Sequence, residues 1–91
     1  MPQKTPEILY YFKSKNCAPC KSSSKTVDEY VSNSLSLKTV VIDIEDIDAF
    51  EYSAMFRVRS LPCIIVVDKQ NEVINRFDSV SEINIKNLLA L

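Results

Sequence analysis

Residues 8–20 read Ile-Leu-Tyr-Tyr-Phe-Lys-Ser-Lys-Asn-Cys-Ala-Pro-Cys, an apolar run followed by two closely spaced cysteines. We expect the apolar run to form a buried strand and the segment after Cys17 to begin a helix. At the start of a helix, Cys17 and Cys20 lie on one face, one turn apart, and can close a small disulfide with little backbone movement. The unpaired N–H groups and the dipole at this position favour a thiolate, the form of cysteine that attacks disulfides.

The length and composition predict one small globular domain. The chain has 91 residues, of which 46% are hydrophobic and 25% charged, and we expect residues 1–6 to be a flexible lead. The net charge of −1 argues against general binding to nucleic acid or to a membrane surface, and no apolar stretch is long enough to span a bilayer. The first residues lack the apolar core of a signal peptide. We therefore expect a cytoplasmic protein, in which a spaced cysteine pair is more often catalytic or metal-binding than structural.

Histidine and glycine are both missing from the chain, and each absence excludes a class of site. The sequence has no histidine, which excludes Cys–His nucleophilic pairs, histidine general bases and His-bearing zinc fingers. It also has no glycine, where average usage gives about six, so the glycine-rich phosphate loop and the dinucleotide-binding fingerprint cannot form. Turns must use other residues, and we expect Asn71 or Asp78 in a left-handed conformation.

The hydrophobic pattern predicts the element order β-α-β-α-β-β-α. The expected strands are 7–12, 37–44, 63–67 and 72–77, and the expected helices are 19–34, 49–56 and one that follows residue 79. We expect Asp48 to cap the second helix, and the sequence from Ser79 to Glu82 to form a capping box for the last. Strands alternating with helices indicate a parallel pair with a right-handed crossover, and the final hairpin across 68–71 adds an antiparallel half. The fold class is therefore α/β, with a mixed four-stranded sheet flanked by helices.

Several side chains are assigned to the core or left open. We expect these aromatic residues to be buried: Tyr10, Phe12, Phe50, Phe56 and Phe77. Apolar residues at helical spacing are Val27, Tyr30, Val31 and Leu35 in the first helix and Val80, Ile83, Leu88 and Leu89 in the last. Tyr11 and Tyr52 can be core residues or can line a substrate groove. Cys63 is expected to be a buried apolar residue at the start of a strand, and the alternative is a thiol close enough to the dithiol to form other disulfides.

This layout, with Cys-x-x-Cys after the first strand and Leu61-Pro62 before the third, resembles the thioredoxin-like family over residues 7–91. The resemblance implies that Cys17 is an exposed nucleophile, that Cys20 is the resolving thiol and that the bond before Pro62 is cis. It also implies that Leu61 pairs its backbone with an extended substrate. The substrate-binding residues implied in this way are Asn16, Ala18, Pro19, Leu61 and Pro62.

The reaction that the resemblance implies is reduction of protein disulfides by thiol–disulfide exchange. It requires no bound cofactor and no metal, and the electrons come from an NADPH-linked flavoprotein reductase or from glutathione. The partners implied are disulfide-bearing proteins and a thioredoxin-reductase-like protein, and the chain is expected to act as a monomer. Two alternatives stay open: a glutathione-coupled, glutaredoxin-like reductase, and a non-catalytic adaptor that binds peptides or partner proteins with the same fold.

The chain departs from the thioredoxin pattern around the dithiol. Thioredoxins usually have Trp-Cys-Gly-Pro-Cys, whereas here Asn16 and Ala18 take the places of tryptophan and glycine. Tyr11 stands where the family has a buried acid that assists proton transfer at the resolving cysteine. The loss of that negative charge, together with Lys15 and Lys21, is expected to favour the Cys17 thiolate.

Three further groups of residues carry charge or could bind a metal. Lys13 also flanks Cys17, whereas Lys25 is expected to be solvated. Acidic residues between positions 43 and 51 are expected to form a solvated face opposite in sign to the lysines. Three thiols without imidazole fall short of the four ligands of a closed zinc site, although a cluster shared across a dimer stays open.

Overall fold

The computed structural model describes residues 5–91, and it has the α/β element order expected from the sequence. The strands are β1 (Ile8–Lys13), β2 (Lys38–Asp43), β3 (Cys63–Val67) and β4 (Val73–Phe77), and the helices are α1 (Ala18–Val31), α2 (Ala49–Met55) and α3 (Ile85–Leu89). The expected lead over residues 1–6 lies partly outside the described residues, and residues 5 and 6 belong to no helix or strand. Within residues 5–91, no helix has the length and apolar character needed to cross a membrane.

The four strands form one mixed sheet in the order β2-β1-β3-β4. Strand β1 runs parallel to β2 and antiparallel to β3, and β3 pairs antiparallel with β4 in the expected hairpin. The parallel pair is joined through α1, as a crossover connection requires. Strand β1 therefore lies in the interior of the sheet, between two neighbours, which is why its sequence is a nearly continuous apolar run.

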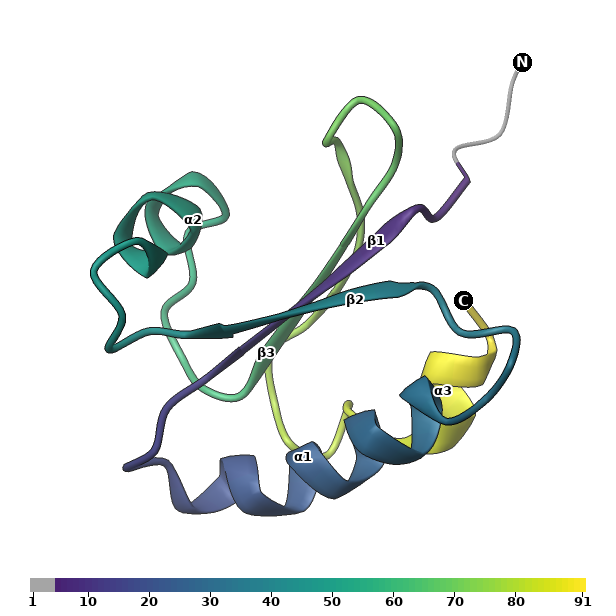
Figure 1. Cartoon of the computed structure of the whole chain (residues 1–91), viewed down its shortest axis with the longest axis horizontal. Coiled ribbons are helices and arrows are strands. Elements are labelled where there is room, and N and C mark those ends of the chain that lie inside the picture. Colours follow the sequence, from purple (N-terminus) through teal and green to yellow (C-terminus); the bar gives the residue numbers. More distant parts are fainter. Residues whose placement is uncertain (1–4) are drawn as a thin grey trace.

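The alternation of side chains along β1 builds the two halves of the core. Leu9 and Tyr11 pack with Val27 and Tyr30 of α1 on one face of the sheet. On the opposite face, the buried side chains of β1 pack with Ala49 of α2, and that cluster includes Tyr10, Phe12 and Phe56. Figure 1 shows α1 and α3 side by side below the strands and α2 on the other side of the sheet. Both faces are therefore covered, and β1 and β3 are shielded from water.

The register of the sheet determines which segments meet at the end of β1. Phe12 lies opposite Ile42 of β2 on one side and opposite Cys63 of β3 on the other. The N–H of Ile44 donates to the carbonyl of Lys13 at 2.9 Å, which continues the parallel pairing by one residue. The segment leaving β1, the segment leaving β2 and the segment entering β3 consequently emerge at one edge of the sheet.

Helix α2 begins at Ala49 as expected, but both predicted helix caps are wrong, and backbone conformation explains both. Asp48 precedes α2, but its own dihedral angles are helical (φ −72°, ψ −15°) and its side chain makes no capping bond; a capping residue needs an extended backbone. In the expected capping box, the Ser79 hydroxyl donates to Glu82 at 3.0 Å within a turn. Helix α3 begins only after Asn84, which is extended (φ −133°, ψ 160°) and accepts from the Asn87 N–H at 2.8 Å.

Some side chains expected in apolar faces are exposed. Phe50 is 74% exposed, because the buried side of α2 is formed by Ala49 and by Phe56 at its end. Helix α1 ends at Val31 rather than near residue 34, so Leu35 lies beyond it and is 89% exposed. The exposed set also contains Val31, Val80 and Leu89. The other expected aromatic core residues are buried, as are Ile83 and Leu88.

Within residues 5–91, two residues adopt positive φ. Asn71 has φ 62°, which confirms the expectation for the β3–β4 turn, whereas Asp78 is not left-handed. The second residue is Arg57, with φ 52°. Its carbonyl accepts from the Arg76 guanidinium at 2.8 Å, and the same guanidinium donates to the Phe56 carbonyl at 2.6 Å. Arg76 of β4 therefore holds the left-handed turn that leads toward Pro62.

We predict that Arg57→Gly stabilises the protein by about 0.5–1 kcal/mol. The left-handed conformation costs a residue with a Cβ about 1–2 kcal/mol, and glycine removes this cost. Part of the gain is lost because glycine raises the conformational entropy of the unfolded chain. The matched control is Arg59→Gly, at an exposed position with ordinary φ, which should be neutral or destabilising. Urea unfolding of the three proteins measures the difference. A loss of stability in Arg57→Gly equal to that in Arg59→Gly contradicts the account of this turn.

Candidate active site

The two cysteines stand at the N-terminus of α1 in the arrangement expected from their spacing. Cys17 is the N-cap residue, with an extended backbone (φ −101°, ψ 105°), and its Sγ accepts from the N–H of Cys20 at 3.2 Å. Pro19 occupies the first turn of the helix, where no N–H partner is needed. Cys17 is half-buried and reachable from solvent, whereas Cys20 is only 3% exposed. The outer thiol is therefore the one that another molecule can reach.

Cys17 and Cys20 are joined by a disulfide, with 5.3 Å between their Cα atoms. This separation lies within the ordinary range for disulfides. Because the two residues belong to the cap and the first turn of one helix, the same backbone also accommodates two free thiols. The site can therefore alternate between a dithiol and a disulfide.

The loop that carries Cys17 is tied to the loop that follows β2. Asn16 donates through Nδ2 to Oε1 of Glu45 at 2.8 Å, and the Ser14 hydroxyl donates to the same oxygen at 3.2 Å. The N–H of Cys17 donates to the Ser14 carbonyl at 3.2 Å. Glu45 thus fixes the residues just before Cys17. Its role escaped the sequence analysis because Glu45 and Asn16 are far apart along the chain.

Positive charge gathers around the dithiol. Lys13, Lys15 and Lys21 line a small cavity of about 150 Å³ that also contains both cysteines. The remaining lining residues are Ser14 and Ser24. Lys25 is exposed and does not belong to this lining. The lysines that the sequence assigned to thiolate stabilisation are therefore placed where they can act, since nearby cations favour the charged form of a thiol.

The segment that enters β3 lies at the same edge of the sheet as the dithiol loop. The Leu61–Pro62 peptide bond is cis, Pro62 is buried and Leu61 is partly exposed. The next residue, Cys63, lies opposite Phe12 near the end of β1. The Ser60 hydroxyl donates to the Asp78 carbonyl at 3.1 Å and ties this segment to the end of β4. Leu61 also lines a cavity of about 440 Å³ with Ile44, Phe50, Ser53, Val58, Arg59 and Ser60.

Several solved structures of other proteins share this architecture. Neither family models nor curated protein sequences give a match. Among solved structures, a malaria-parasite thioredoxin-2, described as a component of protein secretion machinery, is 20% identical and superposes with a TM-score of 0.78 over 99% of this chain and 94% of its own. Thioredoxin 1 from the thermophilic bacterium Thermosipho africanus is 29% identical, with a TM-score of 0.70 over 91% of each chain. Fasciola hepatica thioredoxin is 18% identical, with a TM-score of 0.74 over 91% of this chain and 74% of its own.

The chain is thioredoxin-like. Its fold and its paired cysteines support a thiol–disulfide oxidoreductase in general. In this thioredoxin-like protein, Tyr11, where the resemblance implies a buried acid, lies in the interior strand β1. Tyr11 is 2% exposed, so it belongs to the core rather than to a substrate groove. Tyr52 is 39% exposed, and its ring centroid lies 5.6 Å from that of Tyr10.

The Tyr11 hydroxyl points into the first turns of α1. It lies 3.1 Å from the Cys20 carbonyl oxygen, 2.5 Å from the Ser23 hydroxyl and 3.1 Å from the Ser24 hydroxyl. The sequence analysis did not identify either serine. The available signal was their spacing, because residues three and four positions after Cys20 share its side of the helix.

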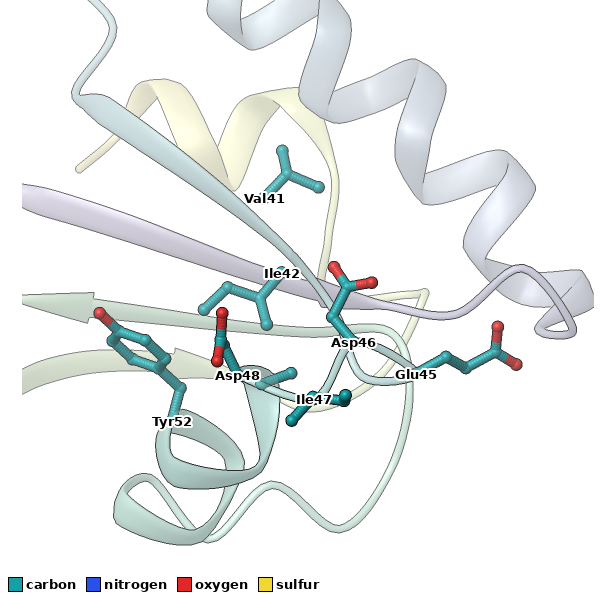
Figure 2. A pocket seen from close by; sticks show the side chains of 8 residues that line it. Val41, Ile42, Glu45, Asp46, Ile47, Asp48 and Tyr52 are labelled. Carbon is teal, nitrogen blue, oxygen red and sulfur yellow. The ribbon is translucent and has the colours of Figure 1, made fainter.

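A third cavity of the thioredoxin-like protein, of about 500 Å³, lies beside the β2–α2 loop. Figure 2 shows the carboxylates of Glu45, Asp46 and Asp48 around Ile47, with Tyr52 on the α2 side. Ile47 is 93% exposed. The expected acidic face is thus present, because Glu45, Asp46, Asp48 and Glu51 are exposed and Asp43 is half-buried.

Cys63, the third cysteine, is buried as expected. It has no exposed surface, and its thiol donates to Oδ1 of Asp78 at 3.6 Å. Burial raises the pKa of the Cys63 thiol from its ordinary value of 9.0 to about 12; Asp78 adds to the rise and Arg76 opposes it. Cys63 is therefore a protonated core residue at neutral pH rather than a second nucleophile.

We predict that Cys63 makes the stability of the protein depend on alkaline pH. The unfolded thiol ionises near pH 9, while the folded thiol keeps its proton until about pH 12. Its stabilising contribution is therefore complete below pH 9 and is lost as the pH rises toward 12. Urea unfolding in a Cys17→Ser/Cys20→Ser background, which prevents disulfide exchange, should show a steeper alkaline loss with Cys63 than with Cys63→Ala. An equal alkaline loss of stability in the two proteins contradicts this prediction.

Proposed function

We propose that this thioredoxin-like protein reduces disulfide bonds in other proteins, with Cys17 as the nucleophile and Cys20 as the resolving thiol. The observation that carries the proposal is the asymmetry of the pair. Cys17 is half-buried and its sulfur accepts a backbone hydrogen bond at a helix N-terminus, while Cys20 is buried. An accessible thiolate backed by a shielded thiol is the arrangement that exchange through a mixed disulfide requires.

The reaction starts from the dithiol form. The Cys17 thiolate attacks one sulfur of the substrate disulfide, the Cys17–substrate bond forms, and the second substrate sulfur leaves with the electron pair as a thiolate. Cys20 then loses its proton and attacks Sγ of Cys17. The Cys17–Cys20 bond forms, the bond to the first substrate sulfur breaks, and that sulfur leaves as a thiolate. The substrate gains two electrons, and the protein ends in the disulfide form.

The substrate-binding surface that we propose surrounds Cys17. Ala18 and Pro19 are exposed beside the outer sulfur, and Asn16 precedes it with its side chain fixed by Glu45. Leu61 and Pro62 lie at the same edge of the sheet. An extended substrate segment can add its backbone to that of Leu61, in the manner of strand addition.

The electrons that restore the dithiol come from outside the chain. We propose an NADPH-linked flavoprotein reductase or glutathione as the donor, with no cofactor bound by this protein itself. Such donors are typical of the cytoplasm, which keeps thiols reduced. The proposed setting is therefore a cytoplasmic monomer that meets disulfide-bearing proteins one at a time.

Reduction of insulin disulfides with dithiothreitol as the donor tests this function. We predict that the native protein accelerates insulin precipitation and that Cys17→Ser returns the rate to that of dithiothreitol alone. The matched control is Cys63→Ala, which removes the thiol outside the pair and should keep the rate within about twofold, because a one-atom truncation in the core perturbs packing and not chemistry.

The alternatives make different predictions in the same assay. No acceleration by the folded native protein contradicts a general protein-disulfide reductase. Activity that requires added glutathione supports the glutaredoxin-like alternative. A protein that is inactive in both assays, and that binds a partner equally well as Cys17→Ser, is an adaptor.

A further inference from the structure

Tyr11 is a buried titratable residue that the exchange reaction, as written above, leaves without a role. Its hydroxyl is enclosed on the α1 side of the sheet and contacts three polar groups of that helix. A phenylalanine would fill the same space without placing a polar group in the core, which is costly unless the group is well partnered. The hydroxyl is therefore the feature that needs an explanation.

The protons in this cluster can be assigned from its donors and acceptors. The Ser23 hydroxyl donates to the Cys20 carbonyl at 3.1 Å, so its proton is occupied there. The Tyr11 hydroxyl can then donate its one hydrogen bond to the Cys20 carbonyl or to the Ser23 oxygen. Its own oxygen accepts a hydrogen bond from the Ser24 hydroxyl. In a second arrangement, Tyr11 donates to Ser24 and frees the Ser24 proton. A hydroxyl is both a donor and an acceptor, so both arrangements are available.

Ser24 connects this cluster to the dithiol. Its side chain is half-buried and lines the small cavity that contains Cys17 and Cys20. It follows Cys20 by four residues on the same helix, which places the two side chains on one face. Ser24 therefore has the Tyr11 hydroxyl on its inner side and the dithiol cavity on its outer side.

We propose that the Tyr11–Ser24 hydroxyl pair stabilises the Cys20 thiolate that forms when the mixed disulfide is resolved. Tyr11 is a positioning residue, because it acts through Ser24 and through the Cys20 carbonyl. This inference rests on the proposed function, since it concerns the resolving step of the same reaction. It assigns to two neutral hydroxyls the stabilisation of a charge that no buried carboxylate within residues 5–91 is placed to influence.

The proton and the electron pair move in a defined order. While Cys20 is a thiol, the Ser24 hydroxyl donates a hydrogen bond to the Tyr11 oxygen, and a lone pair of the Ser24 oxygen faces the cavity. When the Cys20 proton leaves through the cavity to water, Tyr11 turns its proton toward Ser24, and Ser24 turns its own toward the Cys20 sulfur. The Cys20 electron pair then forms the bond to Cys17, and the substrate sulfur leaves as a thiolate and takes a proton from water. No other oxidant, reductant or base is required.

The test measures the ionisation of Cys20 directly and needs no enzymatic activity. In a Cys17→Ser background with ¹³Cβ-labelled cysteine, NMR follows the Cys20 resonance against pH, separately from that of Cys63. We expect Tyr11→Phe and Ser24→Ala each to raise the midpoint of the Cys20 titration by about one pH unit, since each removes hydrogen-bond support of the thiolate. The matched control is Tyr30→Phe.

Tyr30 is a suitable control because it is another buried tyrosine of the same core cluster. It is 3% exposed, and its hydroxyl accepts from the Leu37 N–H at 2.8 Å, at the other end of α1. The Tyr30→Phe variant should leave the Cys20 midpoint unchanged. An unchanged midpoint in folded Tyr11→Phe, or an equal shift in Tyr30→Phe, overturns the proposal.

The outcomes separate this inference from the proposed function. If the native protein fails to reduce insulin but the Cys20 midpoint shifts as expected, the hydroxyl pair is real and the proposed substrate class is wrong. If insulin is reduced and the midpoint does not move, the reductase stands and the role of Tyr11 is rejected. Where Tyr11→Phe does not fold, Ser24→Ala alone decides, because its side chain lies outside the fully buried core.

Discussion

The hydrogen bond from the Cys20 N–H to the Cys17 sulfur is the contact on which the proposed chemistry depends. It makes Cys17 the cap of α1, so the residue proposed as the nucleophile also satisfies a backbone donor of the helix. Strand β1 ends at Lys13, and Glu45 binds Ser14 and Asn16 in the loop between that strand and the helix. The position of the dithiol is therefore set by the short loop that connects the buried strand β1 to helix α1.

Strand β1 determines the positions of the other parts. Its two faces build separate halves of the core, one against α1 and α3 and one against α2. Its pairing with β2 and β3 brings the Glu45 loop and the Pro62 segment to the edge where the cysteines stand. The Arg76 guanidinium of β4 binds the Phe56 and Arg57 carbonyls and so holds the turn that precedes the Pro62 segment. The site is thus assembled from loops whose ends are fixed by one sheet.

Local patterns predicted most of the fold, and long-range contacts account for what they missed. The strand from Cys63 to Val67, the hairpin with left-handed Asn71 and the disulfide pair followed from apolar runs, turn residues and spacing. Asp48 failed as a cap because its backbone is already helical, and Phe50 failed as a core residue because Ala49 and Phe56 form the buried side of α2. The partners of Glu45 and Tyr11 could not be predicted, since each lies on a different element.

The account is tested most directly by the pH dependence of Cys17 alkylation in a Cys20→Ser/Cys63→Ala variant, where Cys17 is the one remaining cysteine. The helix N-terminus and the lysines that line the cavity should place the midpoint of the folded protein below the value of about 8.5 for a free cysteine. The same variant unfolded in urea is the control and should return to about 8.5. A folded midpoint at or above that of the unfolded chain contradicts the claim that this fold activates Cys17.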